Sequence, residues 1–157
     1  MLFRSDLLLN LSIGQYDTYT PLQLTSYINT LATKGKRYKL SFKKQQNEII
    51  DEVNLDEYYM NRIHQGFYDV VNKGTGLGYT DKKFNAAGKT GTSESYYDKN
   101  IMTINSSYIM FAPVDNPKYS VVVVTPNVSY QNERHEYIAS INRFISKELT
   151  DFLFENY

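Results

Sequence analysis

Cysteine and tryptophan are absent from this chain of 157 residues. The lack of cysteine excludes disulfide bonds and thiolate metal sites. Charge of both signs is balanced, since 17 lysines and arginines oppose 17 aspartates and glutamates. A neutral chain gives no reason to expect nucleic acid or an anionic membrane surface as a partner. No apolar run reaches the roughly 18 residues of a membrane span, and the N-terminus lacks a signal-peptide pattern.

The most informative segment is Lys89-Thr90-Gly91-Thr92, which lies in a run of small residues. Side chains alternate between the faces of a strand, so Thr90 and Thr92 share a face and offer two hydroxyls to an anionic carboxylate. Gly91 has no side chain and lets an extended peptide lie close to the strand. Lys89 adds a positive charge beside a reacting centre. The segment therefore predicts a strand that recognises the end of a peptide.

Other segments accompany this strand in a fixed order: Ser12–Gln15 with Thr20–Leu24, then Arg62–Gly76, then Tyr108–Val124. Together with the Lys-Thr-Gly strand these segments form four blocks that follow one another in order across roughly three quarters of the chain, which makes the pattern specific. They resemble the transpeptidase domain of penicillin-binding proteins, the serine enzymes that recognise β-lactams. The Thr-Ser-Glu that follows Gly91 is more similar to the class B branch of that family than to class A.

The resemblance implies a serine acyl-transfer enzyme that cross-links peptidoglycan. In such an enzyme a serine attacks the D-Ala-D-Ala carbonyl of a stem peptide, and the amine of a neighbouring stem resolves the acyl-enzyme. Thr90, Gly91 and Thr92 are then expected to bind the substrate. The backbone N–H of Thr92 would form half of the oxyanion hole, and Lys89 would assist catalysis. The expected partners are the stem peptide, β-lactams and the upstream half of the same domain. No cofactor, metal ion or nucleic acid is expected.

The family orders its motifs as Ser-x-x-Lys, which carries the nucleophile, then Ser-x-Asn, then Lys-Thr-Gly. Ser41–Lys44 and Ser140–Asn142 match the first two patterns as text, but in the wrong order. The stretch after Ser41 is too polar to bury a helix, and Ser140 is expected in a helix after the Lys-Thr-Gly strand. Neither serine is therefore expected to be catalytic.

Residues 1–157 are interpreted as the C-terminal part of one transpeptidase domain, inactive alone, whose upstream half and membrane anchor are absent. The parent is expected at the extracytoplasmic face of the bacterial plasma membrane.

The predicted fold class is α+β, the C-terminal portion of a transpeptidase fold with a three-stranded antiparallel sheet packed with helices. Helices are expected at 20–34 and 56–74, with a long C-terminal helix at 132–154. Strands are expected at 85–93, 107–112 and 119–125. Between the first two strands, 94–105 is expected to form a long polar loop. Residues 35–52 are expected to be irregular or to form a weak hairpin.

Helical spacing of apolar residues also predicts which side chains are buried. The predicted buried residues are Leu24, Tyr27, Ile28 and Leu31 in the first helix, Tyr59, Ile63, Phe67 and Val70 in the second, and Ile138, Ile141, Ile145, Leu149 and Phe152 in the last. His64 and His135 have no ligand partners at metal spacing and are interpreted as surface or boundary residues.

Other interpretations stay open. The chain could be a non-catalytic binding or regulatory fragment of the same fold. Lys89 could be a surface lysine, and both threonines could serve only as strand formers. Gly88-Lys89-Thr90 also ends like a phosphate-binding P-loop, but that motif needs a glycine at the position of Lys83.

The resemblance further implies a missing first strand beside 119–125. The isolated chain is therefore expected to dimerise, swap strands or be poorly soluble.

Overall fold

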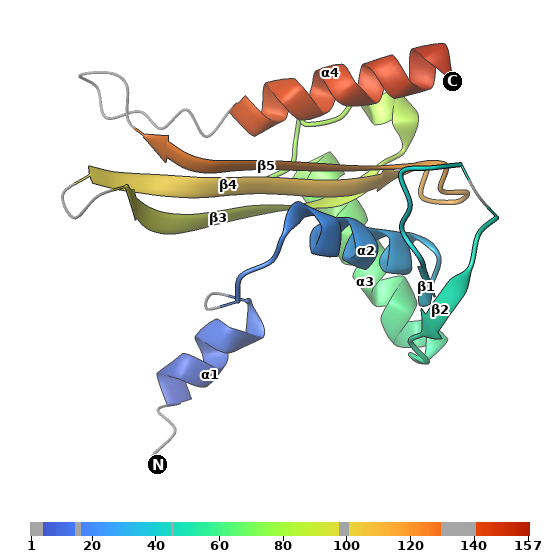
Figure 1. Ribbon diagram of the computed structural model, residues 1–157, viewed down its shortest axis with the longest axis horizontal. Helices are drawn as coiled ribbons and strands as arrows, with labels where there is room; N and C mark the ends of the chain where they lie inside the picture. Colours follow the sequence, from blue (N-terminus) through green and yellow to red (C-terminus); the bar gives the residue numbers. More distant parts are fainter. Residues whose placement is uncertain (1–4, 15–16, 45, 98–100, 130–140) are drawn as a thin grey trace.

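The computed structural model describes residues 5–14, 17–44, 46–97, 101–129 and 141–157 (Figure 1). Its centre is an antiparallel sheet of three strands in the order β3-β4-β5. These strands are β3 (Ala87–Tyr97), β4 (Ile101–Ala112) and β5 (Tyr119–Ser129). The helices are α1 (Ser5–Ser12), α2 (Pro21–Ala32), α3 (Glu57–Lys73) and α4 (Ile141–Asn156). The predicted α+β class, the three-stranded sheet and the C-terminal helix are confirmed. In the described part of the chain, no helix is both long enough and apolar enough to cross a membrane.

The weak hairpin expected at 35–52 is present. The short strands β1 (Lys36–Tyr38) and β2 (Ile49–Glu52) pair antiparallel and form a sheet of their own. They lie together beyond one end of the main sheet (Figure 1). Most of their residues are exposed, in agreement with the polar, lysine-rich sequence of this segment.

Capping residues set the starts of both central helices. Thr20 precedes α2, and its hydroxyl accepts a hydrogen bond from the Gln23 backbone N–H at 3.2 Å while the Gln23 side chain accepts from the Thr20 N–H at 2.8 Å. Asp56 caps α3 by accepting from the Tyr58 N–H at 2.8 Å, and Gly74 ends that helix. Such caps satisfy backbone donors that the first helical turn leaves free. Both helices therefore begin where the sequence predicts.

The two faces of the sheet form two separate cores. Alternate β4 residues, Tyr108 and Met110, belong to the core that α4 covers. Their neighbours Ile109 and Phe111 belong to the core that α2 covers on the opposite face. Helix α3 takes part in both cores, since Met60 near its start packs with α2 and Val71 near its end packs in the α4 core. Its C-terminal end therefore reaches the α4 face beside β3.

The most buried residues of α3 each lie one position after a residue that was predicted to be buried. Tyr59 is 57% exposed, whereas Met60 and His64 are buried. The interpretation of His64 as a surface or boundary residue is wrong, because it faces the end of α2. Its Nε2 lies 2.7 Å from the Leu31 carbonyl oxygen, which satisfies a helix-terminal acceptor. Tyr27 was also predicted to be buried, but it is 50% exposed at the margin of the face that α2 packs against the sheet.

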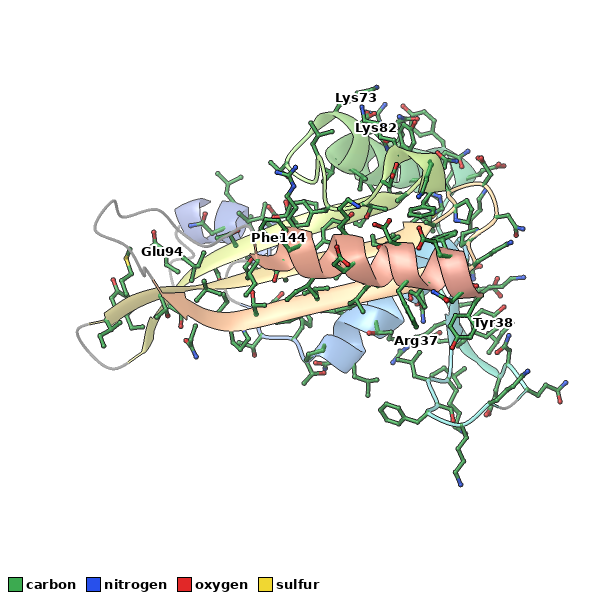
Figure 2. All side chains as sticks on the ribbon, turned by 90° about the horizontal axis from the view of Figure 1, so that it is seen from above. Arg37, Tyr38, Lys73, Lys82, Glu94 and Phe144 are labelled. Atoms are coloured by element: carbon green, nitrogen blue, oxygen red, sulfur yellow. The ribbon has the colours of Figure 1, made fainter. Side chains whose placement is uncertain are left out.

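The prediction of a long polar loop at 94–105 is wrong. Strand β3 extends to Tyr97 and β4 begins at Ile101, and the two pair from Ala87 opposite Phe111 to Tyr97 opposite Ile101. Positions 98–100 of the expected loop lie outside the described residues. Glu94 lies on this long hairpin (Figure 2). The polar composition of this segment indicated a loop, but some of its polar residues are buried in the sheet and hydrogen bonded there. Thr103, for example, is 1% exposed, and its hydroxyl donates to the Asn127 side chain at 3.3 Å.

The described part of α4 begins at Ile141, so positions 132–140 of the predicted helix, with His135 and Ile138, lie outside the described residues. The prediction that Ile141, Leu149 and Phe152 are buried is wrong. Their exposed fractions lie between 37% and 55%. The buried positions of α4 are instead polar ones: Asn142, Ser146 and Thr150. Short side chains let this helix lie close to the sheet, and Ile145, Leu153 and Phe154 complete the contact.

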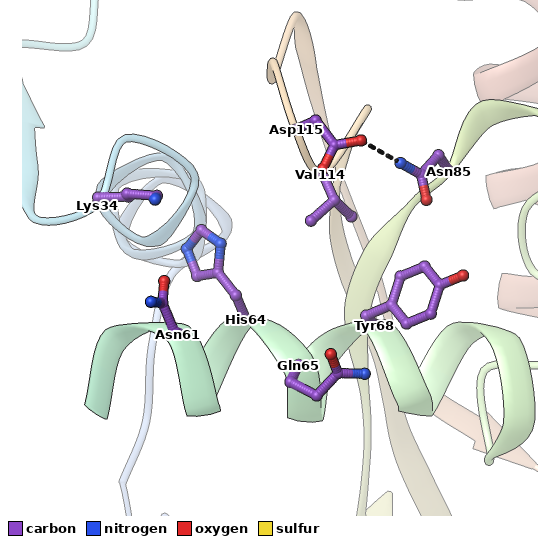
Figure 3. A pocket seen from close by; sticks show the side chains of 8 residues that line it. All are labelled: Lys34, Asn61, His64, Gln65, Tyr68, Asn85, Val114 and Asp115. Atoms are coloured by element: carbon purple, nitrogen blue, oxygen red, sulfur yellow. Dashed lines mark hydrogen bonds between the residues drawn. The ribbon is translucent and has the colours of Figure 1, made fainter. Parts of the chain in front are cut away.

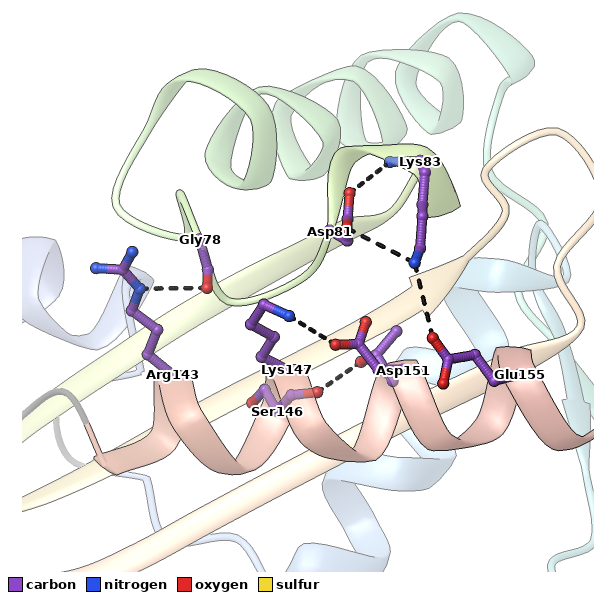
Figure 4. A network of polar contacts seen from close by, with 9 residues as sticks. Gly78, Asp81, Lys83, Arg143, Ser146, Lys147, Asp151 and Glu155 are labelled. Carbon is purple, nitrogen blue, oxygen red and sulfur yellow. Dashed lines mark hydrogen bonds and ion pairs between the residues drawn. The ribbon is translucent and has the colours of Figure 1, made fainter.

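Exposed polar contacts link α4 to the segment before β3 (Figure 4). Arg143 donates to the Gly78 carbonyl oxygen at 3.2 Å, and Lys83 lies 3.9 Å from Glu155. Exposed ion pairs of this kind contribute little free energy. The stacked rings of Phe84 and Phe154, with centroids 4.3 Å apart, lie between the same two segments and bury more apolar surface.

Asn142 offers a direct test of the polar α4 interface. It is fully buried, donates to the Ser106 hydroxyl at 2.9 Å and accepts from the Thr125 hydroxyl at 2.8 Å. Asn142→Ala should destabilise the protein by about 1 to 3 kcal/mol, because it leaves buried hydroxyls without their partner. Thermal unfolding measures the loss. The matched control Asn61→Ala, at an exposed position of α3, should stay within about 0.5 kcal/mol of the parent. Equal stabilities of the two variants would refute this role.

Candidate functional site

The Lys89–Thr92 segment lies within β3, which is an edge strand in the described part of the chain. One side of β3 pairs with β4, so that Thr90 lies opposite Tyr108 and Thr92 opposite Ser106. Directly opposed residues of an antiparallel pair have their side chains on the same face. Thr90 and Thr92 therefore lie on the Tyr108 face, which α4 covers farther along the sheet.

Lys89 and Gly91 lie on the opposite face of β3, where their partners are Ile109 and Ser107. The Lys89 ammonium is exposed, and it donates to the Thr90 carbonyl oxygen at 2.7 Å. Its charge is thus held at the strand edge. Gly88-Lys89-Thr90 lies inside a strand and not in a loop before a helix, which argues against the P-loop interpretation.

The backbone of Thr90 and Thr92 points to the free edge of β3. In an antiparallel ladder the N–H and C=O of one residue point to the same side, and this side alternates along the strand. A Cβ added at Gly88 would lie 2.6 Å from the Ile109 carbonyl oxygen, so this carbonyl points toward β3, where Lys89 is its partner in the ladder. The even-numbered residues consequently direct their N–H groups away from β4. The contact between Lys89 and the Thr90 carbonyl fits this orientation.

Thr75 contributes a contact that the sequence does not predict. Its Oγ1 lies 2.7 Å from the Thr90 Oγ1, and it comes from the turn just after α3. Thr75 lies within the Arg62–Gly76 block of the family resemblance, but the sequence predicts no function for it. Only the path of α3 to the β3 edge brings these two hydroxyls together.

Tyr108 lies opposite Thr90 and is fully buried. Burial raises the pKa of its phenol to about 12, and its hydroxyl lies 3.2 Å from the Thr80 hydroxyl. The phenol is therefore neutral at physiological pH, and it supports the strand without carrying charge.

Of the two sequence matches to upstream motifs, the structure describes Ser41–Lys44 in full and the second match only from Ile141 onward. Ser41 is exposed in the segment between β1 and β2, outside any helix, and its hydroxyl accepts from the Lys43 N–H at 3.1 Å. Ser140 lies outside the described residues. Asn142 uses its amide inside the protein core, as described above. The exposed, non-helical position of Ser41 is consistent with the expectation that it is not catalytic, and the expectation for Ser140 stays a prediction.

A separate hollow lies between α3 and the segments around Asn85 and Asp115 (Figure 3). It measures about 530 Å³ and is lined by Lys34, Asn61, His64, Gln65, Tyr68, Asn85, Val114 and Asp115. The Asn85 amide donates to the Asp115 carboxylate at 3.0 Å on its rim. None of the Lys89–Thr92 residues lines this hollow.

Residues 4–146 match the family model described as the penicillin binding protein transpeptidase domain. The chain belongs to this family. Penicillin-binding protein 2A of Bacillus subtilis is 34% identical over 96% of the chain and 24% of that protein. Peptidoglycan D,D-transpeptidase MrdA of Haemophilus influenzae is 28% identical over 76% of the chain and 22% of that protein. The chain therefore spans about a quarter of the length of these relatives.

The fold agrees with the family. The solved structure of penicillin-binding protein 2B from Streptococcus pneumoniae superposes with a TM-score of 0.77 at 24% identity, and the match covers 99% of this chain and 28% of that one. The family, predicted from the order of the four blocks, and its class B branch, predicted from the Thr-Ser-Glu after Gly91, are thus confirmed.

The two glycines Gly88 and Gly91 of strand β3 should respond differently to an added methyl group. At Gly88 a Cβ would lie 2.6 Å from a backbone carbonyl oxygen and 2.8 Å from the Met110 Cβ, and neither atom moves freely. At Gly91 it would lie 2.5 Å from the Ser107 hydroxyl, which rotates about one bond. Gly88→Ala should therefore destabilise the protein by about 1 to 3 kcal/mol and Gly91→Ala by less. Thermal unfolding of both variants tests this order, and the reverse order would contradict the register.

Proposed function

We propose that this chain is the substrate-recognition half of a peptidoglycan D,D-transpeptidase, which cross-links stem peptides through a serine acyl-enzyme. The observation that carries the proposal is the edge of β3. There the Thr90 and Thr92 side chains share one face, and the ladder directs the Thr92 N–H outward. The family model that matches 4–146 and the relative named a D,D-transpeptidase support the same activity.

In the proposed complex the D-Ala-D-Ala end of a stem peptide lies extended along β3. The terminal carboxylate accepts hydrogen bonds from the hydroxyls of Thr90 and Thr92, and Gly91 leaves room for the peptide. The carbonyl that is attacked directs its oxygen to the Thr92 N–H. A preformed donor at this position stabilises the negative charge that develops in the tetrahedral intermediate.

The nucleophilic serine would come from the upstream half of the same domain. Its oxygen forms a bond to the carbonyl carbon, the bond to the terminal D-Ala nitrogen breaks, and D-Ala leaves with a proton. The amine of a neighbouring stem then attacks the acyl-enzyme, forms the cross-link and returns the serine. Lys89 supplies a positive charge beside these steps and would hydrogen bond toward the Ser-x-Asn serine. A β-lactam would occupy the same edge, and its ring amide bond would open as the serine is acylated.

The parent enzyme would then act at the extracytoplasmic face of the bacterial plasma membrane, where peptidoglycan is its substrate. Residues 1–157 would form the C-terminal part of one transpeptidase domain and would not turn over alone. No cofactor or metal ion takes part in this scheme.

A second candidate is a non-catalytic binding or regulatory fragment of the same fold. The exposed, non-helical position of Ser41 favours it, since the Ser-x-x-Lys match does not supply a helix-borne nucleophile in the described part of the chain. In that case the β3 edge would still bind the peptide, but no acyl-enzyme would form. Radiolabelled or fluorescent penicillin distinguishes the two candidates, because only a catalytic parent retains the label after denaturation.

Lys89→Ala or Thr92→Val in the full-length parent should lower the rate of acylation by penicillin by about ten- to a thousandfold, because each removes an electrostatic contact at the reacting centre. Stopped-flow or gel detection of the labelled enzyme gives this rate. Lys82→Ala, at an exposed lysine outside β3, is the matched control and should acylate at the parental rate. If both Lys89→Ala and Thr92→Val are acylated at the parental rate, the assignment of β3 to the reacting centre is refuted.

The isolated chain should associate with itself. In the described residues the outer edge of β5 pairs with no strand, and its sequence is rich in valine. The exposed Phe144 and Phe152 of α4 add apolar surface. An open strand edge pairs readily with another chain, so the chain of residues 1–157 should form dimers, strand-swapped species or precipitate. Analytical ultracentrifugation tests this, and a clean monomer at high concentration contradicts it.

A further inference from the structure

The contact between Thr75 and Thr90 joins a residue outside the Lys-Thr-Gly segment to one of its proposed carboxylate-binding hydroxyls. The two oxygen atoms are 2.7 Å apart, and either could donate. Thr75 is exposed and Thr90 is half-buried, so the contact lies at the surface of the proposed site and not in the core.

The turn that carries Thr75 is fixed by backbone hydrogen bonds on both sides of it. The N–H groups of Gly74 and Gly76 both donate to the Val70 carbonyl oxygen, at 3.2 and 2.9 Å. The Leu77 N–H then donates to the Gly74 carbonyl oxygen at 3.1 Å. Thr75 is therefore presented by a turn that closes the end of α3.

A further hydrogen bond holds this turn against the strand. In the last part of α3, the Asn72 amide donates to the Ala86 carbonyl oxygen at 3.2 Å, directly before β3 begins. The end of α3 is thus attached to β3 at the start of the strand through Asn72 and at the Lys-Thr-Gly segment through Thr75. The backbone bonds of the turn and the Asn72 contact therefore position the Thr75 hydroxyl beside Thr90 independently of the Thr75–Thr90 contact itself.

The direction of the Thr75–Thr90 hydrogen bond follows from the single proton that each hydroxyl carries. A hydroxyl has one proton to donate and lone pairs that accept. When Thr90 donates its proton to a substrate carboxylate, its oxygen can only accept from Thr75. The Thr75 hydroxyl then donates to Thr90, which donates to the carboxylate, and each bond in such a chain polarises the next.

On this basis, and resting on the proposed function, we infer that Thr75 is a positioning residue for substrate and β-lactam recognition. It holds the Thr90 hydroxyl in the rotamer that directs its proton to the carboxylate. It does not itself touch the reacting carbonyl. Its loss should weaken the binding of carboxylate-bearing ligands more than it slows the acylation step.

The test uses the full-length parent and penicillin G, whose carboxylate is the probe. The concentration dependence of acylation separates the apparent affinity from the limiting rate. Thr75→Val should weaken the apparent affinity by about three- to thirtyfold, the scale of one hydrogen bond in a charged network, and change the limiting rate less. Thr75→Ser restores the hydroxyl and should return the affinity to within about threefold of the parent. Thr25→Val, at a threonine of α2 whose hydroxyl donates to the Pro21 carbonyl oxygen, is the matched control.

A double-mutant cycle with Thr90→Val separates positioning from packing. If Thr75 acts through Thr90, the Thr75→Val/Thr90→Val pair should bind penicillin no more weakly than Thr90→Val alone. Thr75 is exposed, so the melting temperature should be unchanged, and Thr75→Ala provides a second variant in case valine perturbs the turn.

Parental affinity in both Thr75→Val and Thr75→Ala, or additive losses in the cycle, would overturn the inference. If Lys89→Ala is still impaired, the proposed function survives this result. A parent that penicillin does not acylate at all overturns both the proposed function and the inference.

Discussion

The one-sided pairing of β3 with β4 is the constraint on which the proposed site depends. A register that places Thr90 opposite Tyr108 fixes both threonines on one face and directs their N–H groups to the edge away from β4. A slip of one residue would exchange the positions of Lys89 and Thr90, because successive side chains alternate between faces. The close contact at Gly88, whose hydrogen leaves room for the Ile109 carbonyl oxygen, disfavours such a slip. The register of β3, more than its composition, supports the proposal that this strand recognises the substrate.

The helices keep the β3 edge in place from two directions. On one face α4 lies close to the sheet because its buried side is made of short polar residues, and Asn142 satisfies hydroxyls of both β4 and β5. Beside the edge, α3 passes from one core to the other and ends in the turn that carries Thr75. His64 ties the first half of this helix to the end of α2. The site thus lies where a buried framework meets an open strand edge.

Local signals predicted much of this arrangement, and the errors have a common cause. The caps at Thr20 and Asp56 and the Lys-Thr-Gly strand depend on neighbouring residues, so the sequence reveals them. The hairpin beyond Glu94 could not be recognised, because residues such as Thr103 are polar in sequence but buried and bonded across strands. For the same reason apolar periodicity failed in α4, where Asn142 is buried and Phe152 is exposed. Thr75 was out of reach because its partner is fifteen residues away and the contact depends on the path of α3.

The most direct test is a crystal structure of the full-length parent after acylation by penicillin G. The account predicts that the penicillin carboxylate lies within hydrogen-bonding distance of the Thr90 and Thr92 hydroxyls. It also predicts that the acyl carbonyl oxygen accepts from the Thr92 N–H at the β3 edge. A carboxylate bound to other residues, with the acyl oxygen away from β3, would contradict the assignment of this strand as the recognition element.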